Sequence, residues 1–149
     1  MKSLNDWYAE YAVSHQNQTN KAIHYICVPA IFFSIVGLLM SIPFPDLFPP
    51  PLSWLENWAV LILVPVLIFY LRLSRGMAFK IFLFAGLCVA LNYQMAAVAP
   101  LWAVSLLIFA LAWLGQFYGH KLEGKKPSFL KDLQFLLIGP AWVIDNILK

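Results

Sequence analysis

The sequence predicts an all-α integral membrane protein: a bundle of four transmembrane helices, followed by a C-terminal helical segment that is interfacial or re-entrant. Composition is the first reason. The 149 residues are 62% hydrophobic and 11% charged, whereas a soluble chain is about 45–50% apolar and about 25% charged. Long charge-free runs are the second reason. We expect one membrane domain, residues 1–149, and exclude a disordered chain, a soluble enzyme and a nucleic-acid-binding protein.

The first two expected spans flank a proline-rich loop. A transmembrane helix needs about 20 mostly apolar residues, and residues 23–42 meet this requirement. Five prolines follow within residues 43–51 and break the helix. A second, shorter apolar run covers residues 54–71, where Trp54 and Trp58 are expected interfacial anchors.

The next two spans are expected to form a hairpin. Residues 81–120 contain no Asp, Glu, Lys or Arg, and this length is enough for two crossings. Pro100 cannot continue a helix, so we expect spans at about residues 77–96 and 100–118.

The last apolar segment, residues 129–148, differs from the four spans. Gly139 and Pro140 interrupt it, and Asp132 and Asp145 lie within it. We therefore expect an interfacial or re-entrant helix here, not a fifth crossing. Within the bundle, small residues are expected to allow close helix packing. The candidates are Gly37, Gly86, Ala85 and Ala90.

The basic residues predict the topology. All ten Lys and Arg lie before the first span, around the connection between the second and third (Lys80 in the first turn of the third), or after the fourth. Four crossings place them all on one side, and the positive-inside rule then puts both termini in the cytoplasm. The N-terminus has no features of a cleavable signal peptide. We expect a bacterial inner membrane, or the endoplasmic reticulum if the chain is eukaryotic.

The three histidines are the main candidates for a functional site. His15 and His24 flank the start of the first span and His120 ends the fourth, so the charge map places all three at the cytoplasmic face. Histidine is the commonest metal ligand in proteins. His15 and His24 would lie on opposite sides of one continuous helix. A bend within residues 17–20, which are rich in Asn and Thr, would bring them together.

Two further functions are compatible with these histidines. The protein could transfer electrons through a haem b bound by two of them. It could also be a lipid-binding or scaffold protein without catalytic activity, in which the histidines are incidental. No charged residue lies in the middle of a span, which argues against an ion-coupled transporter.

Two segments resemble the signatures of a known family. They are residues 11–29 (YAVSHQNQTNKAIHYICVP) and residues 113–127 (WLGQFYGHKLEGKKP), the second followed by Gly139-Pro140. The chain resembles the small membrane 2-hydroxy fatty-acid dioxygenases, formerly a domain of unknown function, which include the yeast enzyme of phytosphingosine α-oxidation. The resemblance implies an Fe²⁺-dependent enzyme that uses O₂ to shorten long-chain 2-hydroxy fatty acids by one carbon.

The resemblance also implies the ligands of the metal. The family's catalytic and metal-binding histidines correspond to His15, His24 and His120. Glu123 follows His120 by three residues on the same helix face and is a further candidate ligand. Asp145 stands where the family is expected to have a glutamate, so we assign it no ligand role.

Five other polar residues are expected to support this site. Tyr11, Asn20 and Gln116 each precede one of the histidines by one helical turn. We expect them to fix the imidazole tautomers. Lys121 and Lys125 are expected to bind the carboxylate of the substrate, whose acyl chain would lie between the spans.

Overall fold

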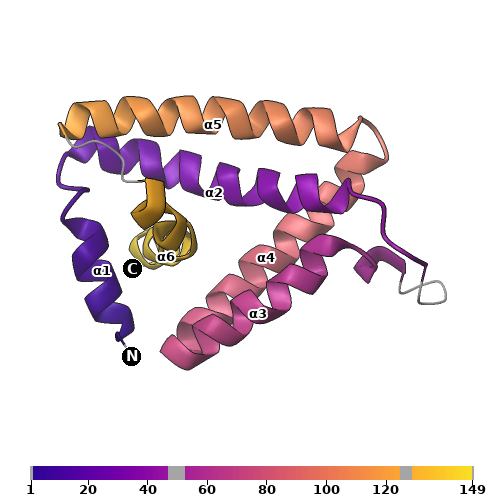
Figure 1. Ribbon diagram of the computed structural model, residues 1–149, viewed down its shortest axis with the longest axis horizontal. Helices are drawn as coiled ribbons and strands as arrows, with labels where there is room; N and C mark the ends of the chain where they lie inside the picture. The colour runs from indigo at the N-terminus through magenta and orange to yellow at the C-terminus, as the bar shows by residue number, and fades with distance from the viewer. Residues whose placement is uncertain (1, 47–52, 125–128, 149) are drawn as a thin grey trace. The chain divides into compact units, whose positions relative to one another are not determined.

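The computed structural model describes residues 2–46, 53–124 and 129–148. Within these ranges all regular structure is helical, which confirms the all-α prediction (Figure 1). The elements are α1 (Leu4–Ala12), α2 (Gln18–Met40), the 3-10 helix η1 (Ser53–Leu55), α3 (Trp58–Leu73), α4 (Arg75–Ala96), α5 (Leu101–Glu123) and α6 (Phe129–Ile147).

Three of these helices are long and apolar enough to cross a membrane. They are α2, α4 and α5, with mean hydropathies of 2.1, 1.6 and 1.7. The other expected span corresponds to α3, which has 16 residues and is shorter than the usual crossing of about 20. Four crossings therefore remain a prediction. The expected interruption at Gly139 and Pro140 is wrong, because α6 continues through both residues.

Local sequence signals explain several helix ends. The α1 helix was not expected from hydropathy, but its start carries a capping box. The Ser3 hydroxyl accepts from the Asp6 amide and the Asp6 carboxylate accepts from the Ser3 amide. The Asn57 side chain caps α3 by accepting from the Val60 amide. Ser74 ends α3, and its hydroxyl caps α4 by accepting from the Met77 amide.

The chain forms two compact units, to which α2 and α5 both contribute. The hairpin unit comprises Phe32–Phe109, and the histidine unit comprises Met1–Ile31 with Ala110–Lys149. In the hairpin unit α3 and α4 lie side by side, and the single residue Ser74 connects them. Its core includes four buried residues of α2, α3 and α4, namely Val36, Ala59, Cys88 and Val89.

Gly37 lies where three helices of the hairpin unit meet. A Cβ atom at this position would overlap the side-chain oxygens of Asn92 on α4 and Ser105 on α5. Both side chains are fully buried, and Asn92 Nδ2 donates to the carbonyls of Phe33 (3.1 Å) and Cys88 (2.9 Å). The expected close approach at Gly37 is therefore confirmed.

The other three candidates for close packing differ from one another. At Gly86 a Cβ atom would meet nothing within 4 Å, and Ala90 is exposed, so both predictions are wrong. Ala85 is buried, with 2% of its surface exposed. Gly86 and Ala90 thus lie on the outer side of α4, away from the packed face.

The histidine unit brings distant segments of the chain together. The N-terminal part of α2 lies against the C-terminal part of α5, where a Cβ at Gly115 would be 2.6 Å from Cys27 Sγ. The α1 helix contacts α6, whose Ile138 and residues 141–144 are buried. This packing positions the three segments that carry the histidines.

We predict that Gly37→Ala destabilises the protein by about 1–3 kcal/mol, because an added methyl in a close-packed interface displaces its neighbours. Gly86→Ala is the matched control in the same unit and should leave stability nearly unchanged, since nothing lies near its Cβ. Thermal unfolding in detergent measures both. Equal effects of the two substitutions would contradict the close approach at Gly37.

Candidate metal centre

A bend between α1 and α2 places His15 opposite His24, as expected, but it lies at residues 13–17 and not within residues 17–20, because α2 already begins at Gln18. The first helix ends at Ala12 and the second begins at Gln18. Asn17 Oδ1 caps the second helix by accepting from the amides of Thr19 (2.9 Å) and Asn20 (3.2 Å). His15 therefore lies in the connecting turn, and His24 lies in the second turn of α2.

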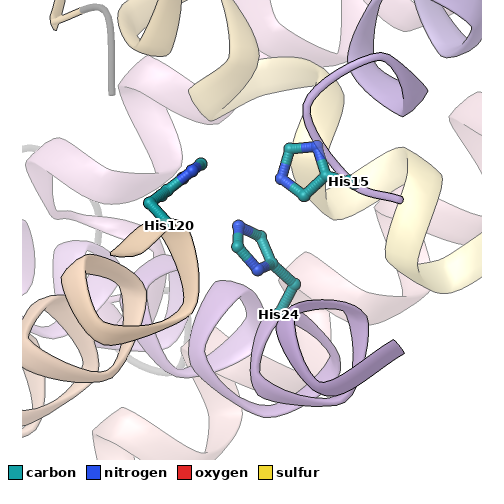
Figure 2. Close-up of side chains that lie close together, drawn as sticks. All are labelled: His15, His24 and His120. Carbon is teal, nitrogen blue, oxygen red and sulfur yellow. The ribbon is translucent and has the colours of Figure 1, made fainter. Parts of the chain in front are cut away.

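The three imidazoles converge on one point (Figure 2). Their ring centroids are 4.3 Å apart for His15 and His24, 5.1 Å for His24 and His120, and 5.5 Å for His15 and His120. One ring nitrogen from each residue lies within 4.8 Å of the others. His15 and His24 are each 2% exposed, and His120 is half-buried. Among the described residues, this is the group of side chains that could hold a metal ion.

Backbone carbonyls fix the tautomers of two of the rings. His15 Nδ1 lies 2.6 Å from the Tyr11 carbonyl oxygen, and His24 Nδ1 lies 2.9 Å from that of Asn20. A carbonyl can only accept, so each Nδ1 carries the proton and each Nε2 carries the lone pair. His15 Nε2 is buried and has no hydrogen-bond partner among the described residues. A buried polar atom of this kind is costly unless a ligand satisfies it.

This donor set fits a first-row metal ion. Neutral imidazole nitrogens bind such ions at about 2.0–2.1 Å, so the three rings would move inward slightly on binding. Three nitrogen ligands leave coordination positions open for other molecules. The proton of each Nδ1 is held by a carbonyl, which is the usual arrangement around a metal-binding histidine.

Aromatic side chains enclose the His15 ring. Tyr11 stacks on it with a centroid separation of 4.0 Å and an interplanar angle of 8°. The ring centroid of Trp142 lies 5.8 Å from that of His15. Burial among these groups lowers the pKa of His15 to about 4. The ring is therefore neutral at pH 7 and can bind a metal. Trp142 was not among the residues expected at the site; its one signal in the sequence is its place two residues after the Gly139-Pro140 motif.

The supporting residues differ in part from the prediction. Tyr11 and Asn20 hydrogen-bond to the imidazoles through their carbonyls, and the Tyr11 ring also stacks on His15. Gln116 is 5% exposed, and its Nε2 has no hydrogen-bond partner among the described residues. Lys121 is exposed at the end of α5, whereas Lys125 lies outside the described residues.

Glu123 does not belong to the cluster of three histidines that could hold a metal ion. Its carboxylate accepts hydrogen bonds from the amides of Gln16 (2.7 Å) and Asn17 (2.9 Å) and from Asn20 Nδ2 (3.0 Å). These bonds join the end of α5 to the start of α2. Asp145 lies in α6 and is half-buried.

The stability of the metal-free protein should depend on the protonation of His15. The unfolded chain takes up this proton near pH 6.5 and the folded chain near pH 4, so the unfolding free energy should fall as the pH is lowered from about 6.5 to 4. His15→Gln removes the titrating group and should flatten part of this dependence. Thermal unfolding at several pH values measures the pH dependence of stability in both proteins. An identical pH dependence in both proteins would contradict the lowered pKa.

Comparisons with known proteins point to one family. Residues 1–149, the whole chain, match a family model described as "2-hydroxy-palmitic acid dioxygenase Mpo1-like". The search of curated proteins and the search of solved structures found no match. The name of the family implies a dioxygenase that acts on a 2-hydroxy fatty acid, and the long apolar helices are compatible with a membrane protein. The chain belongs to the Mpo1-like family.

Proposed function

We propose that this protein is an Fe²⁺-dependent dioxygenase that shortens long-chain 2-hydroxy fatty acids by one carbon. The observation that carries the proposal is the convergence of His15, His24 and His120, with the His15 lone pair buried and unsatisfied among the described residues. The family name supports the substrate class. The donor set itself supports a metal ion, and the oxygen chemistry favours iron among the ions that imidazole binds.

The proposed reaction balances without a further reductant. The bond between C1 and C2 of the 2-hydroxy acid breaks. C2 is oxidised from an alcohol to a carboxyl group, C1 leaves as CO₂, and O₂ is reduced, so that a fatty acid one carbon shorter, CO₂ and water are formed. When bound, Fe²⁺ supplies open positions at which the 2-hydroxy acid and O₂ can meet.

The residues of the chain have three tasks in this proposal. The neutral histidines hold the ion and add no negative charge that would repel an acid. The exposed ammonium group of Lys121, the residue after His120, attracts the carboxylate. Gln116 lies one turn before His120 on α5, and its buried N–H group has no partner among the described residues; it donates a hydrogen bond to a substrate oxygen. The apolar helices accommodate the acyl chain.

A single ion suits the site better than a haem. Two axial histidines of a haem must leave room for the porphyrin between them, and the three rings here are 4.3–5.5 Å apart. A scaffold protein with incidental histidines would gain nothing from the buried His15 Nε2, which has no partner within residues 2–46, 53–124 and 129–148. Both alternatives are therefore less well supported than a mononuclear metal site.

We also propose that α2, α3, α4 and α5 all cross the membrane and that both termini are cytoplasmic. The distribution of the ten Lys and Arg supports this topology. It puts the histidines at the cytoplasmic boundary of the bilayer, where the acid group of a fatty acid can remain in water while its chain stays in lipid. A bacterial inner membrane, or the endoplasmic reticulum of a eukaryotic cell, fits this arrangement.

The purified protein should contain about one iron per chain and consume O₂ with 2-hydroxypalmitic acid, releasing one CO₂ per O₂. His24→Ala removes one of the three proposed ligands, so we expect at least a tenfold loss of iron affinity and no turnover, since substitution of even a ligand's hydrogen-bonding partner costs about 10–100-fold. Elemental analysis and an oxygen electrode measure both quantities.

Two controls make this test specific. Tyr93→Phe changes an exposed residue of the hairpin unit and should keep iron and activity. Palmitic acid lacks the 2-hydroxyl group and should not be consumed. Retention of both iron and turnover in His24→Ala would contradict the proposal, and a haem absorption band in the wild type would favour the electron-transfer alternative.

Replacing Gln116 by Leu should separate stability from activity. The substitution removes a buried donor that has no partner in the part of the chain that the structure describes. Such a donor costs a folded protein about 1–3 kcal/mol, so the melting temperature should stay the same or rise. We expect KM for 2-hydroxypalmitic acid to rise, because the substrate loses a hydrogen bond, while iron content is unchanged. Gln94→Leu, at an exposed position on α4, is the matched control. An unchanged KM in Gln116→Leu would remove this residue from the substrate site.

A further inference from the structure

One carboxylate joins the three segments that carry the histidines. Glu123 lies one helical turn after His120 on α5. Its Oε1 accepts from the amide of Gln16, the residue after His15, and its Oε2 accepts from the amide of Asn17. Oε2 also accepts from the side chain of Asn20, whose carbonyl holds His24 Nδ1.

The negative charge of Glu123 strengthens these three hydrogen bonds. Hydrogen bonds to a carboxylate are stronger than bonds between neutral groups. The amide groups at the start of α2 also form the positive end of that helix, which favours a nearby negative charge. Both carboxylate oxygens act as acceptors: Oε1 for the Gln16 amide, and Oε2 for the Asn17 amide and Asn20 Nδ2. A neutral amide in place of the carboxylate has only one acceptor oxygen, so at least one of these bonds would be lost.

Gly119 makes this arrangement possible. A Cβ atom at Gly119 would overlap Asn20 Oδ1, so only glycine lets α5 approach the Asn20 side chain this closely. The approach brings Asn20 Nδ2 to within 3.0 Å of Glu123. Asn20 itself is completely buried. The contact between α2 and α5 beside the histidines is therefore built around Asn20 and Glu123.

We infer that Glu123 is a positioning residue: it holds the His15 turn and the start of α2 against the end of α5, so that the three imidazoles are preorganised for the metal. This inference rests on the proposed function and deepens it. Glu123 acts through its hydrogen bonds to Gln16, Asn17 and Asn20 and does not ligate the ion. A preorganised site binds more tightly because its ligands need not be ordered on binding.

Amide hydrogen exchange in the metal-free protein tests the joining role directly. In Glu123→Ala the amides of Gln16 and Asn17 lose their acceptor and should exchange about tenfold faster. Glu123→Asp keeps two carboxylate oxygens and should restore part of the protection. Glu10→Ala removes an exposed carboxylate that bonds Lys2 and is the matched control, with no change expected at Gln16 or Asn17.

Binding of Co²⁺ alone tests the effect on the metal centre. Glu123→Ala should weaken Co²⁺ affinity about tenfold and change the visible absorption bands of the ion, while Glu10→Ala leaves both unchanged. Asn20→Ala keeps the carbonyl that holds His24 and should weaken binding less. The double variant should bind nearly as well as Glu123→Ala, because both substitutions remove the same contact.

The outcomes distinguish this inference from the proposed function. A wild type that binds Co²⁺ but shows no dioxygenase activity would contradict the function and leave the positioning role intact. A direct ligand role for Glu123 would be indicated if Asn20→Ala bound Co²⁺ normally and only Glu123→Ala were impaired. Unchanged exchange at Gln16 and Asn17 in Glu123→Ala would overturn the inference.

Discussion

Hydrogen bonds between imidazole Nδ1 atoms and backbone carbonyls orient two of the three clustered histidines and fix their tautomers. They leave His15 and His24 with Nε2 lone pairs that converge with His120. Burial keeps His15 neutral by lowering its pKa to about 4. The fold must supply both conditions, since a ring in water would rotate freely and would be partly protonated near pH 6.5. The packing of α1, α2, α5 and α6 around these rings therefore provides the conditions on which the proposed metal binding depends.

Hydropathy and charge were sufficient to predict much of the fold. The expected spans at residues 23–42, 77–96 and 100–118 correspond to three long apolar helices, because long runs without charge have few alternatives to a helix in lipid. Two features were missed. The α1 helix has only 9 residues, too few for a hydropathy signal, and α6 continues through Pro140 because its other residues maintain the helix.

The site was predictable in outline and not in detail. The bend between His15 and His24 followed from the preference of Asn and Thr for helix starts, and the structure brings the histidines together. The partners of the imidazoles did not follow, because spacing alone cannot distinguish a side chain from a carbonyl on the same turn. The hydrogen bonds of Glu123 to Gln16 and Asn17 join residues more than 100 positions apart. They depend on tertiary packing, which a local sequence pattern does not predict.

The use of main-chain oxygens to orient two rings has a consequence for how this site tolerates change. Every amino acid has the same carbonyl group, so positions 11 and 20 can vary in side chain while the orientation of His15 and His24 persists. The side chains there are then free to serve other needs: Tyr11 shields one ring from water and Asn20 binds a neighbouring helix. Substitutions at positions 11 and 20 would thus change the hydration of His15 or the packing of α2 on α5 more readily than the orientation of the two imidazoles.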